Sequence, residues 1–173
     1  HTTASDGDYT PNDAAELYRS RGYDFIAITD HWTYQNGYSD NGFTVLSGDE
    51  YNVGADVREG IFHILGIGSK EKPRLKHETA TAQSIIDEIK AMDGIAILAH
   101  PAWSLNTHEQ ITSLSHLDGI EIYNSISRYP KNCERAYAGN FVDMLAANGL
   151  DLPLFATDDT HFYSEGYEKC VSY

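Results

Sequence analysis

The sequence predicts an α/β protein built around parallel strands. Short apolar runs alternate with segments of helical spacing along the 173 residues. Several of these runs are apolar throughout, which is typical of parallel strands covered by helices. Four runs end in acidic or imidazole side chains, and the first, residues 25–29, leads into Asp30 and His31. Because the carboxyl ends of parallel strands meet at one edge, this pattern predicts a shared site there, and its spread over many strands favours a closed barrel.

The first half of the chain is expected to contain one helix and three strands. Thr10 followed by Pro11 is typical of a helix start, and Gly22 of its end. A polar loop is expected at residues 33–42. Strands are expected at residues 25–29, 44–47 and 61–67.

The second half continues the alternation. Apolar residues from Ala82 to Met92 follow helical spacing, and Gly94 follows them. A second helix is expected at 133–148, with Tyr137 and Met144 among its inward residues. A short helix is expected at 109–114, and strands at 95–99, 119–123, 154–156 and, beginning another, 169–173.

Composition limits the possible partners. The hydrophobic and charged fractions, 41% and 22%, are those of an ordinary globular protein, and no linker or repeat divides the chain, so residues 1–173 are read as one domain. Twelve Lys and Arg against 26 Asp and Glu give a net charge of −14. Such a surface argues against a broad nucleic-acid or anionic-membrane interface. A small anion stays possible, because bound cations reverse the local sign.

The cysteines and the lack of a long apolar segment say little about the compartment of the protein. Cys133 and Cys170 match no metal or disulfide spacing, so two free thiols are expected. No apolar run is long enough for a transmembrane helix and no signal peptide is visible, which makes the cytoplasm the default expectation. The oligomeric state is left open.

Eight side chains are candidate metal ligands. Five imidazoles and three carboxylates exceed what one ion uses, so two or three ions sharing a carboxylate are expected. Glu50 is the preferred bridge, because it lies within the ligand series and follows a strand. Asp30 is expected to orient a ligand from behind. The candidates are His1, Asp6, His31, Glu50, His63, His100, Asp159 and His161.

Some of these candidates also have ordinary structural readings. His63 falls inside a strand and would also fit a satisfied core histidine, and Asp6 would also fit a loop acid. The aromatic residues beside the motifs either wall a pocket or pack in the core. These are Trp32, Trp103, Tyr123 and Phe162.

In their order, the candidates resemble the PHP family, the polymerase and histidinol phosphatase domain, and within it the stand-alone phosphoesterases. Each motif is weak alone, but the ordered set is specific. The motifs are His-Thr-x-x-Ser-Asp-Gly at 1–7, Thr-Asp-His at 29–31, Gly-Asp-Glu at 48–50, His63 in a strand, Ala-His-Pro at 99–101 and Asp-x-His at 159–161.

The resemblance implies a distorted (β/α)7 TIM-like barrel with up to three divalent ions at its mouth. It implies that His1 is the second His of a His-x-His motif whose first strand lies ahead of this sequence, which is then truncated there and possibly at its C-terminal end. It also implies hydrolysis of phosphate esters, with Glu50 and His161 acting through a water that bridges the ions. Loop cations and one amide are candidate substrate contacts, with a solvated surface charge as the alternative reading for each cation. They are Arg58, Asn124, Arg128 and Lys131.

The expected function is therefore hydrolysis of a small phosphorylated substrate, such as a nucleotide or sugar phosphate, by a metal-activated hydroxide. The mixed ligand set suits Mn, Fe or Zn. One alternative is another metallohydrolase on a similar barrel that cleaves an amide, although no Lys here ends a strand as a bridge would. The other is a non-catalytic metal-binding module, although such a module would be expected to show gaps among its ligands. Monoester and diester substrates are not distinguished.

Overall fold

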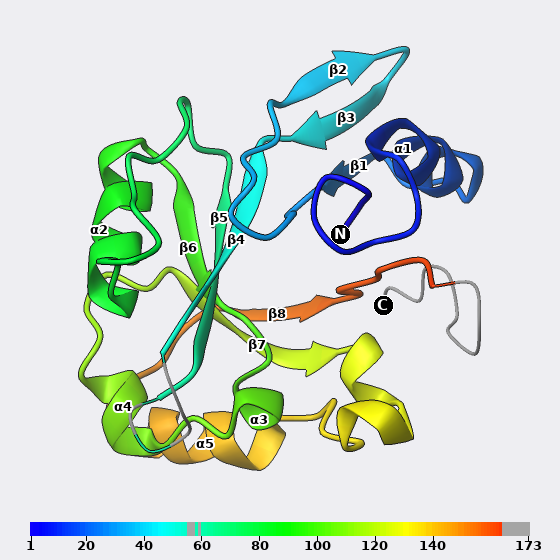
Figure 1. Ribbon diagram of the computed structural model, residues 1–173. Coiled ribbons are helices and arrows are strands. Elements are labelled where there is room, and N and C mark those ends of the chain that lie inside the picture. Colours follow the sequence, from blue (N-terminus) through cyan, green and yellow to red (C-terminus); the bar gives the residue numbers. More distant parts are fainter. Residues whose placement is uncertain (55–57, 59, 164–173) are drawn as a thin grey trace.

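Two β-sheets meet at one corner of the protein, as Figure 1 shows for the computed structural model. The structure describes residues 1–54, 58 and 60–163. The first sheet has the order β1-β3-β2 and comprises β1 (Phe25–Ala27), β2 (Tyr38–Asp40) and β3 (Phe43–Leu46). The second has the order β4-β5-β6-β7-β8 and comprises β4 (Gly48–Val53), β5 (Phe62–Ile67), β6 (Ile95–Leu98), β7 (Gly119–Asn124) and β8 (Leu154–Thr157).

The two ten-residue helices begin at side-chain caps that the sequence supplies. The Thr10 side chain accepts a hydrogen bond from the Asp13 backbone N–H at the start of α1, and Thr81 and Ser84 form a reciprocal capping box on α2. None of the described helices combines the length and apolar composition that crossing a bilayer requires. The helices are α1 (Pro11–Ser20), α2 (Ala82–Ala91), α3 (Pro101–Ser104), α4 (His108–Thr112) and α5 (Gly139–Ala147), with 3₁₀ turns η1 (Ile126–Arg128) and η2 (Pro130–Asn132).

The main core lies between α2, α4, α5 and one face of the five-stranded sheet. Ile85, Ile86 and Ile89 of α2 are fully buried, at 0% exposure. Their spacing places all three on one side of the helix, where they pack against Ile64 and Leu98 of the sheet. The opposite face of this sheet is left to build the candidate site.

The strand directions are mixed, so the expectation of parallel strands is wrong for part of the sheet. Strand β7 runs parallel to both of its neighbours, β6 and β8, as β1 does to β3. Strands β4, β5 and β6 are antiparallel. The connection from Val53 to Phe62 is too short for the crossover that parallel neighbours need, so a return in the opposite direction is the only option.

The described residues do not form the closed (β/α)7 barrel that the sequence predicts. Strands β1 and β8 are edge strands of their sheets. A cavity of about 720 Å³ lies between them, and its apolar lining includes Ile26, Ile28, Ile97 and Phe155. The strand expected ahead of His1 is outside this sequence and stays a prediction.

Two local predictions are also wrong. The expected loop at 33–42 contains β2, which pairs with β3 through a turn at Asn41 and Gly42, both with positive φ. Asn-Gly is a strong hairpin signal, so this strand was readable from the sequence. The expected helix at 133–148 begins only at Gly139, because positive φ at Cys133 and Glu134 interrupts it.

Two side chains expected to point inward from the helix predicted at 133–148 are exposed instead. Tyr137 precedes the helix and is 67% exposed, and Met144 is 59% exposed, so neither points inward. Leu145 is buried as expected. Cys133 is an exposed free thiol, and Cys170 and the strand expected at 169–173 lie outside the described residues.

The two sheets are joined at the chain that follows β1. The Glu50 N–H donates to the Asp30 carbonyl at 3.1 Å, and the Trp32 N–H donates to the Glu50 carbonyl at 2.9 Å. This short parallel pairing places His31 directly beside Glu50. Glu50 therefore lies inside β4, not just after a strand as the sequence suggested.

Replacing Ile86 with alanine tests the assigned core. Because Ile86 is fully buried, Ile86→Ala is expected to lower the free energy of unfolding by about 2–5 kcal/mol. Urea unfolding followed by circular dichroism measures the loss. Glu78→Ala, at an exposed position before the helix, should leave stability near the wild-type value. Equal stability of the Ile86→Ala variant and the wild type would contradict this core.

Candidate metal centre

The N-terminal loop is held against the sheets by a buried carboxylate. Asp30 is 0% exposed and accepts hydrogen bonds from the Thr2 N–H at 2.6 Å, the Thr2 hydroxyl at 2.8 Å and the Ser5 hydroxyl at 2.8 Å. Gln35 donates a further bond at 3.0 Å. These bonds occupy the Asp30 oxygens and fix the loop that carries His1 and Asp6.

A glycine closes the same loop. The Gly7 N–H donates to the Thr2 carbonyl at 2.9 Å. A Cβ atom at position 7 would lie only 2.4 Å from the His1 carbonyl oxygen, so a side chain there would push the loop open. The Ser-Asp-Gly run thus has a steric reason for its last residue.

Glu50 lies at the centre of the site. Its side chain is 2% exposed. His1 Nε2 lies 2.9 Å from one carboxylate oxygen, while His63 Nδ1 lies 2.6 Å and His100 Nε2 3.5 Å from the other. One carboxylate therefore faces imidazoles that come from the N-terminal loop, β5 and the end of β6.

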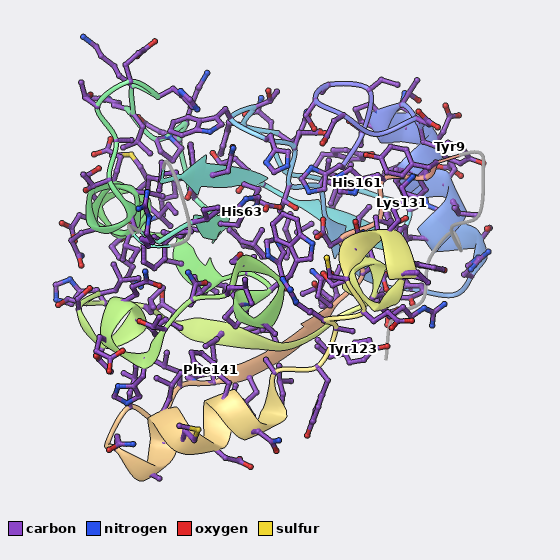
Figure 2. All side chains as sticks on the ribbon, turned by 60° about the horizontal axis from the view of Figure 1, so that its bottom comes forward. Tyr9, His63, Tyr123, Lys131, Phe141 and His161 are labelled. Carbon is purple, nitrogen blue, oxygen red and sulfur yellow. The ribbon has the colours of Figure 1, made fainter. Side chains whose placement is uncertain are left out.

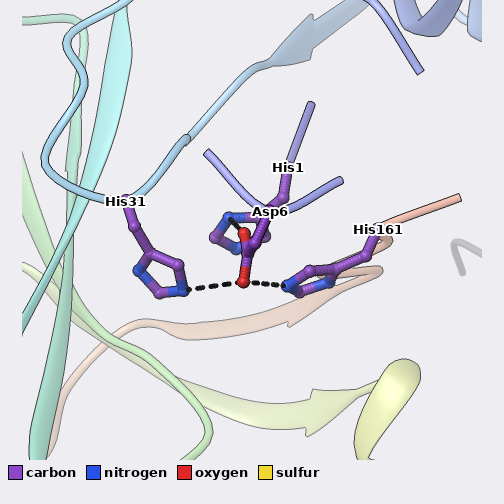
Figure 3. A group of neighbouring side chains, drawn as sticks. All are labelled: His1, Asp6, His31 and His161. Atoms are coloured by element: carbon purple, nitrogen blue, oxygen red, sulfur yellow. Dashed lines mark ion pairs between the residues drawn. The ribbon is translucent and has the colours of Figure 1, made fainter. Parts of the chain in front are cut away.

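Asp6 forms a second cluster with the imidazoles of distant segments, as Figure 3 shows. One Asp6 oxygen lies 3.4 Å from His161 Nε2 and 3.9 Å from His31 Nε2. The other lies 3.4 Å from His1 Nδ1. His1 also stacks on His161, with ring centroids 4.1 Å apart.

Asp159 completes the arrangement. Its Oδ1 lies 3.0 Å from His1 Nε2, and its Oδ2 lies 3.8 Å from His100 Nε2. Asn124 donates a hydrogen bond to Oδ2 at 3.1 Å, which fixes the carboxylate from behind.

The described residues offer three groups of side chains with potential ligand atoms within 4.8 Å of one another. Each pair of groups shares one member, which is His1, His31 or Glu50. His100 belongs to none of the three but borders the group that contains Glu50 and Asp159. The groups are His1, Asp6, His31 and His161; His31, Glu50 and His63; and His1, Glu50 and Asp159.

The ring orientations fit metal binding. His161 Nδ1 lies 2.9 Å from the Asp159 carbonyl, and His100 Nδ1 lies 3.2 Å from the Ser104 hydroxyl. Such contacts fix a ring and leave its Nε2 directed into the site, as is typical of metal-bound histidine. In the described part of the chain, the buried Nδ1 of His31 makes no hydrogen bond. The donor set therefore fits divalent cations.

The carboxylates set the protonation of the buried imidazoles. Burial alone would lower the pKa of His100, but its contacts with Glu50 and Asp159 raise the pKa to about 9. The pKa of His1 is also raised despite burial, through Asp159 and Glu50. The pKa of Glu50 is held well below its ordinary value by the same histidines, against the effect of its burial. His31 differs, because burial lowers its pKa.

The backbone is strained where ligands are presented. His100 has φ +26° and Asp159 has φ +49°, both in the left-handed region. Such conformations cost about 1–3 kcal/mol each and persist where surrounding contacts enforce them. Both residues follow the end of a strand, so the turn directs their side chains back over the sheet edge.

Of the candidate substrate contacts, the structure places only Lys131 on the lining of the cavity. A cavity of about 290 Å³ opens over the ligand cluster, and Lys131 lines it. Arg58 and Arg128 are not part of that lining. Asn124 is 1% exposed and lies beneath the cavity, where it contacts Asp159 and Glu121.

Glu121 is a buried acid to which the sequence assigned no role. It accepts hydrogen bonds from the His100 N–H at 2.7 Å, Asn124 at 3.1 Å and the Thr157 hydroxyl at 2.6 Å. Burial raises its pKa to about 7. The sequence did contain a clue to this residue, because Glu121 is an acid within the otherwise apolar strand 119–123. Side chains alternate between the two faces of a strand, and this alternation turns Glu121 toward the site.

Comparison with known proteins was made by sequence and by fold. No family model matches the sequence. Over 121 residues the chain is 26% identical to an uncharacterized protein of Methanocaldococcus jannaschii, and the match covers 68% of each chain.

Solved structures are similar over nearly the whole chain. An amidohydrolase from Chromobacterium violaceum, with bound sulfate and no metal, has a TM-score of 0.67 at 16% identity and covers 93% of this chain and 85% of its own. A protein of Bifidobacterium adolescentis, inferred to be a metal-dependent phosphoesterase, has a TM-score of 0.64 at 16% identity. The match covers 99% of this chain and 90% of that protein. A two-domain protein of Bacteroides vulgatus containing a predicted PHP-like metal-dependent phosphoesterase has a TM-score of 0.65 at 18% identity. The match covers 93% of this chain and 50% of that protein.

The chain has the PHP-like fold. At these identities the similarity concerns the fold, and the chemistry must be argued from the side chains. The fold prediction drawn from the ordered motifs is confirmed at this level, while the roles of the individual residues stay predictions.

Metal affinity is expected to increase with pH. In the metal-free protein His100, with a pKa of about 9, and His1 hold protons that a bound cation must displace. The Kd for Zn²⁺ should therefore fall between pH 6.5 and pH 8.5, with release of protons. Calorimetric titration in buffers of different ionisation enthalpy measures both the Kd and the number of protons released.

The exposed His116 supplies the control for this measurement. It pairs with Asp87 away from the site, so His116→Gln should behave as the wild type does. A Kd independent of pH, without proton release, would show that these imidazoles do not bind the ion.

Loss of Asp30 should weaken metal binding without removing a ligand. Because Asp30 fixes the loop that carries His1 and Asp6, Asp30→Ala is expected to raise the Kd for Zn²⁺ by about 10–100-fold. Asp24→Ala, at an exposed position before β1, is the matched control. An affinity equal to that of the wild type would exclude this supporting role.

Proposed function

We propose that the protein is a metal-dependent hydrolase of small phosphate esters. The observation that carries this proposal is the sharing of Glu50 between two of the three ligand groups. A carboxylate in this position suits a centre with two neighbouring cations, the arrangement used for in-line displacement at phosphorus. His1 and His31 extend the arrangement to a possible third cation.

The residues present would hold two to three divalent ions, of which Mn, Fe and Zn suit a mixed imidazole and carboxylate set. When bound, such ions supply Lewis-acid chemistry, which lowers the pKa of a water molecule and neutralises phosphoryl charge. Glu50 would be the ligand shared by two neighbouring ions. His161 and Asp6 hold the side of the cluster that borders the cavity.

The charge of the site supports a small anionic substrate. The floor of the cavity contains Asp6, Glu50 and Asp159, which would repel an anion until cations offset them. Lys131 adds a positive charge on the wall.

Amide hydrolysis is the second candidate, because the Chromobacterium violaceum neighbour is named an amidohydrolase. The candidate bridge in this chain is the carboxylate of Glu50, not a modified lysine. Lys90, on α2, forms an ion pair with Asp118, and Lys131 belongs to the 3₁₀ turn η2. We therefore place phosphate esters first.

A screen of metal-loaded protein tests the proposal. With Mn²⁺ or Zn²⁺ the protein should release phosphate from small esters and leave N-acyl amides intact. Glu50→Gln should lose turnover by more than the roughly 10–100-fold that is typical for residues behind the ligands, together with at least one bound ion. Elemental analysis and phosphate release measure the two effects.

The exposed Glu78 again supplies a matched control, as Glu78→Gln, which should keep metal and activity. Stoichiometric metal without hydrolysis of any ester would favour a binding module. Cleavage of amides but not of esters would favour the second candidate. Full metal content and turnover in Glu50→Gln would refute the bridging role.

A further inference from the structure

The cavity over the ligand cluster has one wall that is chemically unlike its floor. The floor is formed by the candidate ligands, and the wall by α3 and the η1–η2 segment. The part of this wall that the η1–η2 segment forms, called here the η wall, consists of Ile126, Ser127, Lys131 and Asn132. Among the described residues that line the cavity, Lys131 is the one lysine or arginine.

Buried hydrogen bonds fix the η wall to the floor. Asn124 accepts bonds from the Ser127 N–H at 3.1 Å and the Ser127 hydroxyl at 2.8 Å. The same side chain donates to Asp159 at 3.1 Å. Asn132 donates to the Ile126 carbonyl at 3.0 Å, which closes the turn that carries Lys131. The lysine backbone is therefore set at a defined height above the carboxylates.

Aromatic rings narrow the cavity on either side of the cluster. Trp103 packs edge-on against His100 and His63, with centroids 5.1 and 5.6 Å apart. Tyr163 stacks on His161 at 5.2 Å, and Lys131 Nζ lies 5.6 Å from the centroid of the Tyr163 ring. Lys131 thus lies on the His161 side of the cavity, as Figure 2 also indicates.

The size and charge of this cavity discriminate between classes of ester. About 290 Å³ is at the lower end of ligand pockets, which span roughly 300–1,000 Å³. A phosphate monoester has one organic substituent and close to two negative charges near neutral pH. A diester has two substituents and one charge. A single lysine opposite a cation-binding floor suits the smaller and more highly charged group.

We propose that Lys131 selects dianionic phosphate monoesters over diesters by contacting a terminal phosphoryl oxygen on the His161 side of the cavity. This inference rests on the proposed function. The ammonium group acts as a point charge, so its contribution depends on the charge of the phosphoryl group.

Paired substrates with the same leaving group test the selection. The Mn²⁺-loaded protein is assayed with p-nitrophenyl phosphate and bis(p-nitrophenyl) phosphate. Lys131→Met should lower kcat/KM for the monoester by about 10–100-fold, the effect of losing a charged hydrogen bond, and leave the diester value near that of the wild type. Lys131→Arg, which keeps the charge, should retain most of the preference. Lys76→Met, at an exposed position that does not line the cavity, is the control.

Binding of inorganic phosphate supplies a readout without turnover. Calorimetry should show weaker phosphate binding to Lys131→Met than to the wild type and the Lys76→Met control. If the wild type hydrolyses neither these two esters nor any other small ester of the screen, the proposed function fails. If it hydrolyses them and Lys131→Met changes both substrates equally or neither, the selection by Lys131 is wrong while the proposed function stands.

Discussion

The burial of the Glu50 carboxylate is the constraint on which the site depends. A charged carboxylate removed from water is unfavourable unless cations or strong donors face it. Here imidazoles from three separate segments face it, and its pKa is held low in return. In the metal-free chain His1 and His100, whose pKa values are raised, provide balancing charge by holding protons. Divalent ions would provide it when bound, so the same geometry explains both the raised pKa values of His1 and His100 and the expected metal affinity.

The fold delivers these groups by joining two sheets at a short parallel pairing. The segment after β1 runs beside β4, which places His31 next to Glu50. Supporting residues lie one layer further in. Asp30 fixes the N-terminal loop, and Glu121 with Asn124 connects the backbone of His100 to Asp159. The ligands are thus positioned by buried hydrogen bonds in addition to the strands that carry them.

The sequence predicted the fold class, and which side chains the structure brings together, better than it predicted topology. The ordered motifs identify the candidate ligands because each motif is local, as Thr-Asp-His shows at His31. Strand direction depends on connection length and on neighbours distant in sequence, so the antiparallel β4 and β5 were missed. The position of Arg128 outside the cavity and of Lys131 on its wall depends on a 3₁₀ turn whose direction composition does not reveal. Glu121 needed the three-dimensional neighbours of β7 to acquire a role.

Anomalous diffraction from crystals soaked in Mn²⁺ tests the central claim most directly. Recorded at the manganese edge, the maps should show at least two ions, one on each side of the Glu50 carboxylate, about 3.5–4 Å apart. His63 would lie beside one of them, and Asp159 beside the other. The absence of manganese at Glu50, or a single ion that contacts only one of its oxygens, would contradict a shared bridging carboxylate.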